Sequence, residues 1–568
     1  RNRIYSQILD NLNKAAIVGF DYTEISQRLR NAWPADTAQL HVYEDVQRCA
    51  AIFREYCLQN NLLDYSLQIE VFQRYLWRTE ACQTHLQTAY RHLIYDNIEE
   101  NPPAAHDLLS EWLPRFDSAL LIYDQDAGYR RFLGADPLNG YKLSVYCDER
   151  HVFSESLVST PVLNAFCAQF GQVLERTNDR FTSRLRSEDL NLAITYPDRV
   201  LRFYPQMLDW VADSVSSLIE GGTEPGEIVL LAPLLPDSLR YALASRLESR
   251  GIPYRSHRPS RALRDEPAAQ ALLTLAALAH PDWGIRPSLF EAAYMLVQTI
   301  EGLDFIRAKL LVESAYRRSP GQFLLLPFQK IRPELQERIT YAAGERYDVL
   351  RSWLESYAAE PVEEIDFFFS RLFGEVLSQP GFAFHGNFAA GTVCANLIES
   401  AQKFRWAVAG RTPAPADPAA PEVPLGLEYF NMIQDGVLAA QYIESWQIPS
   451  ENAVLLAPAY TFLLANQPVD YQFWLDVGSS AWSERLYQPL THPYILSRQW
   501  VPDRVWTDVD EFEFNRDTLY RLVLGLAHRC RRRIFLGLSE MGESGFESRG
   551  MLLRAIQIVL QQSRGYAR

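Results

Sequence analysis

Several features that mark other protein classes are missing from this chain. Its 568 residues contain no apolar run near the roughly 18 residues that span a bilayer, and the longest nearly apolar stretch is 271–279. No signal peptide opens the sequence. Seven cysteines are scattered, without a CxxC pair or the spacing of a zinc or iron–sulfur site. We therefore expect a cytoplasmic protein with no membrane partner.

Lysine and net positive charge are also scarce. Only five of the 55 basic residues are lysine, and the formal net charge is −15. This balance argues against a surface that binds duplex DNA through phosphate contacts alone, although a local basic groove stays open. The chain is too long for one hydrophobic core, so we expect about three or four domains.

Two short apolar runs predict neighbouring parallel strands. Residues 92–96 and 118–124 each end in an acid, Asp96 and Asp124, and residues 104–113 between them are amphipathic. Buried strands joined by a helix indicate a parallel sheet. Both acids then lie at carboxyl ends of strands, where open α/β sheets bind ligands. Two interpretations fit this position: a Mg²⁺–nucleotide site, or acids that only cap strands.

A second α/β unit is predicted further along the chain, and a helical insertion interrupts it. Residues 286–409 have helical periodicity with little strand signal, and 410–424 form a Pro/Ala-rich connector. The strands of the unit are expected at 227–232, 453–457, 473–477 and 533–538, and its helices at 204–218, 238–250 and 518–529.

Four segments together resemble the motor motifs of UvrD/Rep-type superfamily 1 DNA helicases. Residues 93–100 resemble the Walker B motif, which is four apolar residues and then Asp-Glu-x-Gln-Asp. Residues 124–136 resemble the motif that follows it. Tyr204 resembles the tyrosine of the Asn-Tyr-Arg-Ser motif, and 527–534 resemble the final Thr-Arg-Ala motif. The order and spacing of the segments carry the resemblance, which covers about residues 60–285 and 446–540.

The resemblance implies an α/β fold with two RecA-like parallel-sheet motor domains and helical insertions. The implied domains are a helical insertion-like region at 1–90, part of the first RecA-like domain at 91–197, the first part of the second at 198–285, a helical insertion with the connector at 286–445, and the second part of the second RecA-like domain with a tail at 446–568.

The resemblance also implies ATP and Mg²⁺ as cofactors, with a set of catalytic residues. Asp96 would be the metal ligand. Because Asn97 stands at the position of the family's catalytic glutamate, Glu99 or Glu100 would have to substitute for it as catalytic base. Arg529 would reach the γ-phosphate as an arginine finger. An alternative for Arg529 is a solvated basic face formed with the arginines that follow it.

Further contacts are implied for aromatic and charged residues outside the catalytic set. Tyr204 would stack on adenine, and Asp124 would lie in the nucleotide site. Phe132, flanked by Arg130 and Arg131, would contact single-stranded DNA by base stacking. Both aromatic residues could instead belong to hydrophobic cores.

Several residues depart from the family pattern. The chain has no Gly-Lys-Ser/Thr phosphate loop, so either the native protein continues upstream of Arg1 or the loop is lost. Asn97 stands where the family has its catalytic glutamate, and an amide cannot accept the proton. Ala127 replaces a glutamine that senses the γ-phosphate, and Pro205 and Leu133 replace arginines.

The sequence leaves three functions open. The first is a helicase-fold protein of DNA repair or recombination that binds DNA, hydrolyses ATP weakly or not at all, and works beside a catalytically active helicase or nuclease subunit. The second is an active ATP-dependent DNA translocase whose phosphate loop lies upstream. The third is a protein-interaction scaffold without a nucleic-acid role, because fold alone does not fix function.

Overall fold

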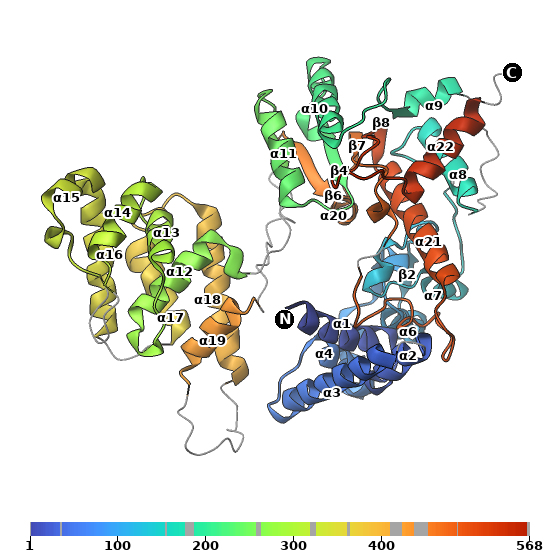
Figure 1. Cartoon of the computed structure of the whole chain (residues 1–568). Coiled ribbons are helices and arrows are strands. Elements are labelled where there is room, and N and C mark those ends of the chain that lie inside the picture. Colours follow the sequence, from blue (N-terminus) through green and yellow to red (C-terminus); the bar gives the residue numbers. More distant parts are fainter. Residues whose placement is uncertain are drawn as a thin grey trace. The chain divides into compact units, whose positions relative to one another are not determined.

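The computed structural model describes residues 2–34, 37–153, 156–175, 187–256, 263–317, 325–359, 364–408, 423–436, 452–484 and 487–564. It is a mixed α/β protein with parallel sheets, as the sequence predicts. The chain forms two compact units (Figure 1). The helical unit comprises residues 1–6, 56–62 and 260–442, and the sheet unit comprises 7–55, 63–259 and 443–568.

The helical unit is built on α12 (Pro267–Ala279), which is buried nearly all round because its residues are mainly alanine and leucine. Around it lie α13 (Leu289–Thr299), α14 (Phe305–Ala315), α15 (Pro333–Ile339), α16 (Tyr341–Ala358), α17 (Ile365–Leu372), α18 (Phe388–Val408) and α19 (Leu425–Gln434). Since α12 belongs to this core, the unit begins earlier than the boundary at 285 that the sequence suggests. The connector 410–424 lies outside the described residues except for its last two.

The first 90 residues are mainly helical, as expected, and most of them belong to the sheet unit. The helices are α1 (Asn2–Val18), α2 (Ile25–Ala32), α3 (Thr37–Gln59), α4 (Tyr65–Val71) and α5 (Glu80–Ala89). The first three contribute to a hydrophobic core that also contains Leu490, Ile495 and Leu496. A segment near the end of the sequence therefore completes the core of the first helices, a pairing that sequence periodicity does not predict.

A small parallel sheet follows, formed by β1 (His92–Tyr95) and β2 (Ser118–Leu121) and joined by α6 (Pro103–Trp112). The predicted parallel pairing is confirmed. One face packs on a cluster that includes Leu109 and Leu143. The prediction that both strands are buried is wrong for the other face, because Ile94 and Leu120 on it are exposed.

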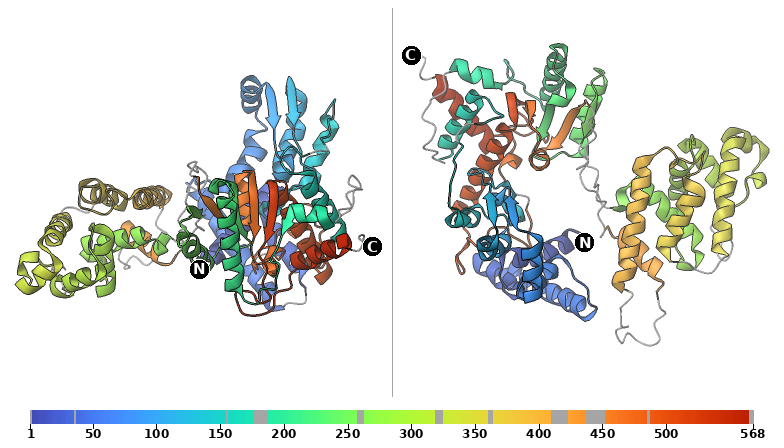
Figure 2. Two further views of the ribbon diagram at one scale, coloured as in Figure 1. Left: turned by 90° about the horizontal axis from the view of Figure 1, so that it is seen from above. Right: turned by 180° about the vertical axis from the view of Figure 1, so that it is seen from behind.

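The larger sheet has six parallel strands in the order β3-β8-β7-β4-β6-β5. Figure 2 shows orange and red strands of this sheet lying side by side. The strands are β3 (Ile194–Thr195), β4 (Ile228–Ala232), β5 (Tyr254–Ser256), β6 (Val454–Pro458), β7 (Val469–Trp474) and β8 (Cys530–Leu536). Since all run the same way, the sheet has an amino edge, where the strands begin, and a carboxyl edge, where they end. The helical unit interrupts the sheet between β5 and β6, as predicted.

Helices cover both faces of the six-stranded sheet, which explains why β4 is apolar throughout. Ile228 and Leu230 face α10 (Tyr204–Glu220) and α11 (Asp237–Glu248). Val229 and Leu231 face the core formed by α8 (Pro161–Val173), α9 (Ser187–Ala193), α20 (Ala459–Ala465), α21 (Asp508–Ala527) and α22 (Met551–Arg564). Helices α8 and α9 thus pack in this sheet's core, whereas the sequence suggests that they belong with β1 and β2.

Among the described residues, no helix combines the length and the apolar character that crossing a membrane would require.

Candidate functional site

Asp96 lies directly after β1 at the carboxyl end of the small sheet, as predicted. It is exposed, and its Oδ1 accepts a hydrogen bond of 2.9 Å from the backbone N–H of Asn97. Asn97 has a φ of 52°, a left-handed conformation that asparagine tolerates better than most residues. This turn sends the chain into a short 3₁₀ helix, Ile98–Glu100, whose residues are all buried.

Glu100 is held by three backbone groups of the loop that follows β2. Its Oε1 accepts hydrogen bonds from the N–H of Gly128 at 2.7 Å and of Tyr129 at 3.1 Å, and its Oε2 accepts one from Arg130 at 2.9 Å. Gly128 has a φ of 97°, which glycine adopts without a steric cost. The carboxylate thus holds residues 128–130 in place. Because both of its oxygens already accept hydrogen bonds, it is poorly placed to take a proton from water.

Glu99 is only 1% exposed, and burial raises its pKa to about 7. The negative charges of Asp124 and Glu100 also raise this pKa, whereas hydrogen bonds that backbone N–H groups donate to the Glu99 carboxylate lower it. One of these is donated to Oε2 by the N–H of Asp124 at 3.0 Å. The other oxygen has no hydrogen-bond partner among the described residues. Glu99 is therefore largely protonated at mildly acidic pH and sheltered from solvent.

Arg131 takes part in a buried charge network that joins the β1–β2 region to α21. Its guanidinium pairs with Asp517, whose carboxylate also accepts from Nε of Arg521 at 3.0 Å. Arg521 donates in addition to the backbone carbonyl of Ala127, and Arg131 lies 5.3 Å over the ring of Tyr494. Asp517 is buried, so these contacts are screened little by water. Arg131 is thus bound to protein groups and does not extend from the surface toward DNA.

Arg529 lies between α21 and β8, at the amino edge of the six-stranded sheet. Its Nε donates to Asn466 Oδ1 at 3.0 Å, and its Nη1 donates to the carbonyl of Gly525 at 2.8 Å. Its Nη2 reaches the hydroxyl of Tyr129 at 3.3 Å, and the guanidinium lies 5.7 Å from that ring. The arginine of the final motif and the loop after β2 are therefore in contact, and the guanidinium is already bound by protein groups.

Phe132 and Arg130 lie on the same 3₁₀ segment, Tyr129–Leu133. Phe132 is 42% exposed, and its ring meets Tyr460 edge-on at 5.6 Å. Part of the ring is thus available to a stacking partner. Arg130 is partly buried, and its Nε has no hydrogen-bond partner among the described residues.

Tyr204 lies apart from this group. It is the first residue of α10, and burial, together with the nearby carboxylates of Asp476 and Glu543, raises its pKa. Asp476 follows β7 at the carboxyl edge, whereas Arg529 precedes β8 at the amino edge. At about 3.3 Å per residue, the strands separate the two edges by about 20 Å. The structure therefore does not bring Tyr204 and Arg529 to one nucleotide.

Two titratable groups missed by sequence reasoning lie beside Asp124. Burial and the negative charge of Asp124 raise the pKa of Asp126, and the hydroxyl of Tyr520 donates a hydrogen bond to its carboxylate. Burial lowers the pKa of His528, although the negative charges of Asp124 and Asp126 act to raise it. Asp126 lies in the segment 124–136, which resembles a helicase motif, so the sequence could have identified it as a candidate site residue. Nothing local marks His528, which meets the aspartates only through the tertiary fold.

The described residues do not form a complete site for ATP and Mg²⁺. They contain no group of three or more histidine, cysteine or acidic side chains that could hold a metal ion. Asp96 alone could act as one carboxylate ligand, which is the usual protein share at Mg²⁺–phosphate sites. The carboxylate of Glu100 and the guanidinium of Arg529 already bind protein groups in place of a nucleotide or its attacking water.

Comparison with protein-family models finds no match to this chain, and no curated protein matches it.

Proposed function

We propose that this chain is a degenerate member of the UvrD/Rep-type superfamily 1 helicases that binds single-stranded DNA and hydrolyses ATP weakly or not at all. In this account β1–β2 and the six-stranded sheet are two RecA-like domains, the first incomplete. The protein serves DNA repair or recombination beside a catalytically active helicase or nuclease subunit.

The proposal rests mainly on the residues at and near the position of the general base. The family's glutamate position holds Asn97, which cannot take a proton from water. The two nearby carboxylates are poor substitutes because of their positions: Glu100 is bound to three backbone N–H groups, and Glu99 is 1% exposed and accepts a hydrogen bond from the N–H of Asp124. No solvent-accessible carboxylate follows Asp96 in this turn, because Glu99 and Glu100 are both buried.

The state of the candidate arginine finger supports the same conclusion. A finger must be free to reach the γ-phosphate as charge develops on it. Arg529 donates to Asn466, Gly525 and Tyr129 instead, and each of these contacts would have to break. The carboxylate of Glu100 and the guanidinium of Arg529, which ATP hydrolysis would need, therefore stabilise the fold instead.

A second candidate, the active translocase, is favoured by one observation. The face of β1–β2 that carries Ile94 (75% exposed), Leu120 (54%) and Ile122 (42%) is uncovered by the described residues. Ile94 and Leu120 are direct partners in the strand register. Parallel sheets are ordinarily covered on both faces. A further polypeptide segment fits there, and Asp96 at the end of that face would adjoin a phosphate loop carried on it.

The third candidate, a scaffold without a nucleic-acid role, draws on the net charge of −15. Under that hypothesis the partly exposed ring of Phe132 is a surface feature without a ligand.

The DNA-binding part of the proposal is tested by replacing Phe132 with alanine. Stacking on one base contributes about 1–3 kcal/mol, so the variant should bind a fluorescent oligothymidine about tenfold more weakly in an anisotropy titration. Binding of the unchanged protein should also weaken as salt is raised. The exposed Phe153→Ala is the matched control and should leave the affinity unchanged. Salt-insensitive or absent binding by the unchanged protein would favour the scaffold.

A further inference from the structure

A cavity of about 480 Å³ lies at the carboxyl edge of the six-stranded sheet, far along the strands from Arg529. The segments that leave the adjacent strands β3 and β8 form part of its wall, at 197–201 and 538–540. The start of α22 and the residues before it form the rest. The volume is in the range of small-molecule sites, and the carboxyl edge is where open parallel sheets bind ligands.

The wall of this cavity is fixed before any ligand arrives. The N–H of Glu540 donates to the carbonyl of Leu201 at 2.9 Å, which joins the two strand exits. The N–H of Gly550 donates to the carbonyl of Gly478 at 2.6 Å, and a Cβ at Gly550 would lie 2.5 Å from the carbonyl oxygen of Ser479. Only glycine permits this approach, so the backbone just before α22 is held against the loop after β7.

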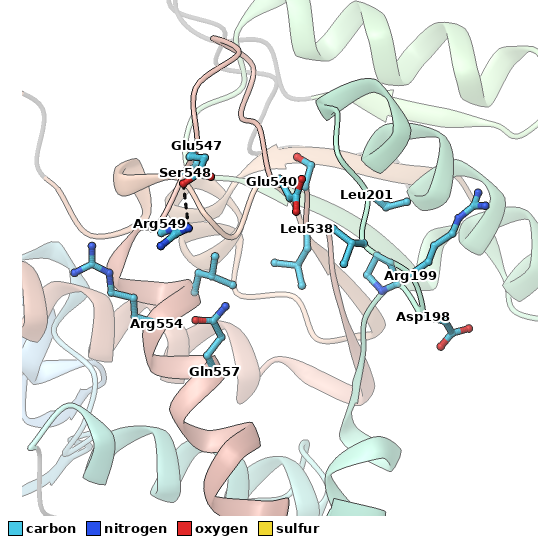
Figure 3. Close-up of a pocket in the computed structure, with 14 residues that line it drawn as sticks. Asp198, Arg199, Leu201, Leu538, Glu540, Glu547, Ser548, Arg549, Arg554 and Gln557 are labelled. Carbon is cyan, nitrogen blue, oxygen red and sulfur yellow. Dashed lines mark ion pairs between the residues drawn. The ribbon is translucent and has the colours of Figure 1, made fainter.

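Three arginines and three acidic residues line the cavity: Arg199, Arg549, Arg554, Asp198, Glu540 and Glu547. Figure 3 shows Arg549, Arg554 and Gln557 on one side, Arg199 on the opposite side, and Glu540 between them. Arg549 pairs with Glu547 at 3.1 Å, while Arg554 is exposed.

The two arginines lie at the end of a helix that ordinarily carries negative charge. Arg549 and Arg554 flank the start of α22, and the first turn of that helix contains no acidic residue. Positive charge is disfavoured at this end of a helix by its dipole. Residues that break a local rule in this way are expected where a ligand compensates for them. A phosphate would neutralise both guanidinium groups and form strong charge-assisted hydrogen bonds.

We propose that this cavity binds a nucleoside monophosphate, with the phosphate on Arg549 and Arg554 and hydrogen-bond donors of the sugar or base on Glu540. The volume accommodates a ligand of this size, and the carboxylate lies where a group with N–H or O–H donors would meet it. The site is separate from the Asp96 and Arg529 region, and the inference does not depend on the helicase proposal.

Isothermal titration calorimetry of the full chain tests the site, with AMP, GMP, CMP and UMP as ligands and adenosine as the ligand without phosphate. We expect at least one monophosphate to bind, adenosine to bind at least tenfold more weakly than AMP if AMP is that ligand, and inorganic phosphate to compete. Arg554→Gln should weaken binding about tenfold, the loss of one charge-assisted hydrogen bond. The double change of Arg549 and Arg554 to glutamine should weaken it further.

Two control variants show whether binding is specific to this cavity. Arg115→Gln removes an exposed arginine of the β1–β2 region and should have no effect. Asp96→Asn should also leave binding unchanged. The proposal is overturned if no monophosphate binds at millimolar concentration, if adenosine matches AMP, if both arginine variants bind like the unchanged protein, or if Asp96→Asn abolishes binding. Cooperative thermal unfolding of the arginine variants, at or above the unfolding temperature of the unchanged protein, shows that they are folded.

Discussion

Replacing Glu100 with alanine is expected to release the loop after β2 and to lower the free energy of its local opening by about 3 kcal/mol. The backbone N–H groups of residues 128–130 would each lose a charged acceptor inside a buried site. Hydrogen–deuterium exchange of peptides that span residues 126–132 measures the effect directly. Exchange there should become about a hundredfold faster, the equivalent of that free energy.

Two variants make this result specific. Glu100→Gln keeps one acceptor oxygen and should show an intermediate effect. Glu111→Ala removes a carboxylate that pairs with Arg78 and bonds Trp77, and should leave exchange at 126–132 unchanged. If Glu100→Gln leaves exchange unchanged but abolishes ATP turnover, Glu100 is a catalytic base and the structural role assigned to it is wrong.

Replacing Glu99 with glutamine is expected to remove a pH dependence from the stability of the sheet unit. The pKa of Glu99 is about 7 in the folded chain, against an ordinary 4.5, so the folded state holds a proton that the unfolded state releases. Stability therefore falls as pH rises from about 4.5 to about 7, by at most about 3 kcal/mol. Glutamine can still accept from the N–H of Asp124 but does not ionise.

Thermal unfolding between pH 4 and pH 8 checks this expectation. The variant and the unchanged protein should unfold at similar temperatures near pH 4, and the variant should be the more stable of the two at pH 8. Glu149→Gln changes an exposed carboxylate and serves as the control. A variant that is equally destabilised at every pH would mean that Glu99 contributes through packing or hydrogen bonding, without the raised pKa.

The periodicity of the sequence predicted most of the secondary structure because burial follows it closely. The run 227–232 is β4, buried on both sides, and the helix expected at 204–218 is α10. Parallel pairing of β1 and β2 followed from the helix between them. The exposure of Ile94 could not be predicted, because an apolar strand carries no sign that one of its faces is uncovered by the rest of the chain.

The composition of the candidate site was harder to predict than the fold. Motif order suggested that Tyr204 and Arg529 share a nucleotide, but order along a chain does not say at which edge of a sheet a residue lies. The role of Glu100 depends on backbone donors about 30 residues away, which only the folded turn at Asn97 brings within reach. Asp517 and Arg521 were missed for the same reason, since their partners precede them by almost 400 residues.

ATP hydrolysis by the native full-length protein, with and without single-stranded DNA, tests the central claim most directly. The proposed helicase-like chain, with no accessible general base after Asp96 and with Arg529 bound to protein groups, predicts no turnover above background while the protein remains folded and retains DNA. DNA-stimulated turnover that is abolished by Asp96→Ala would contradict the account and identify a working motor.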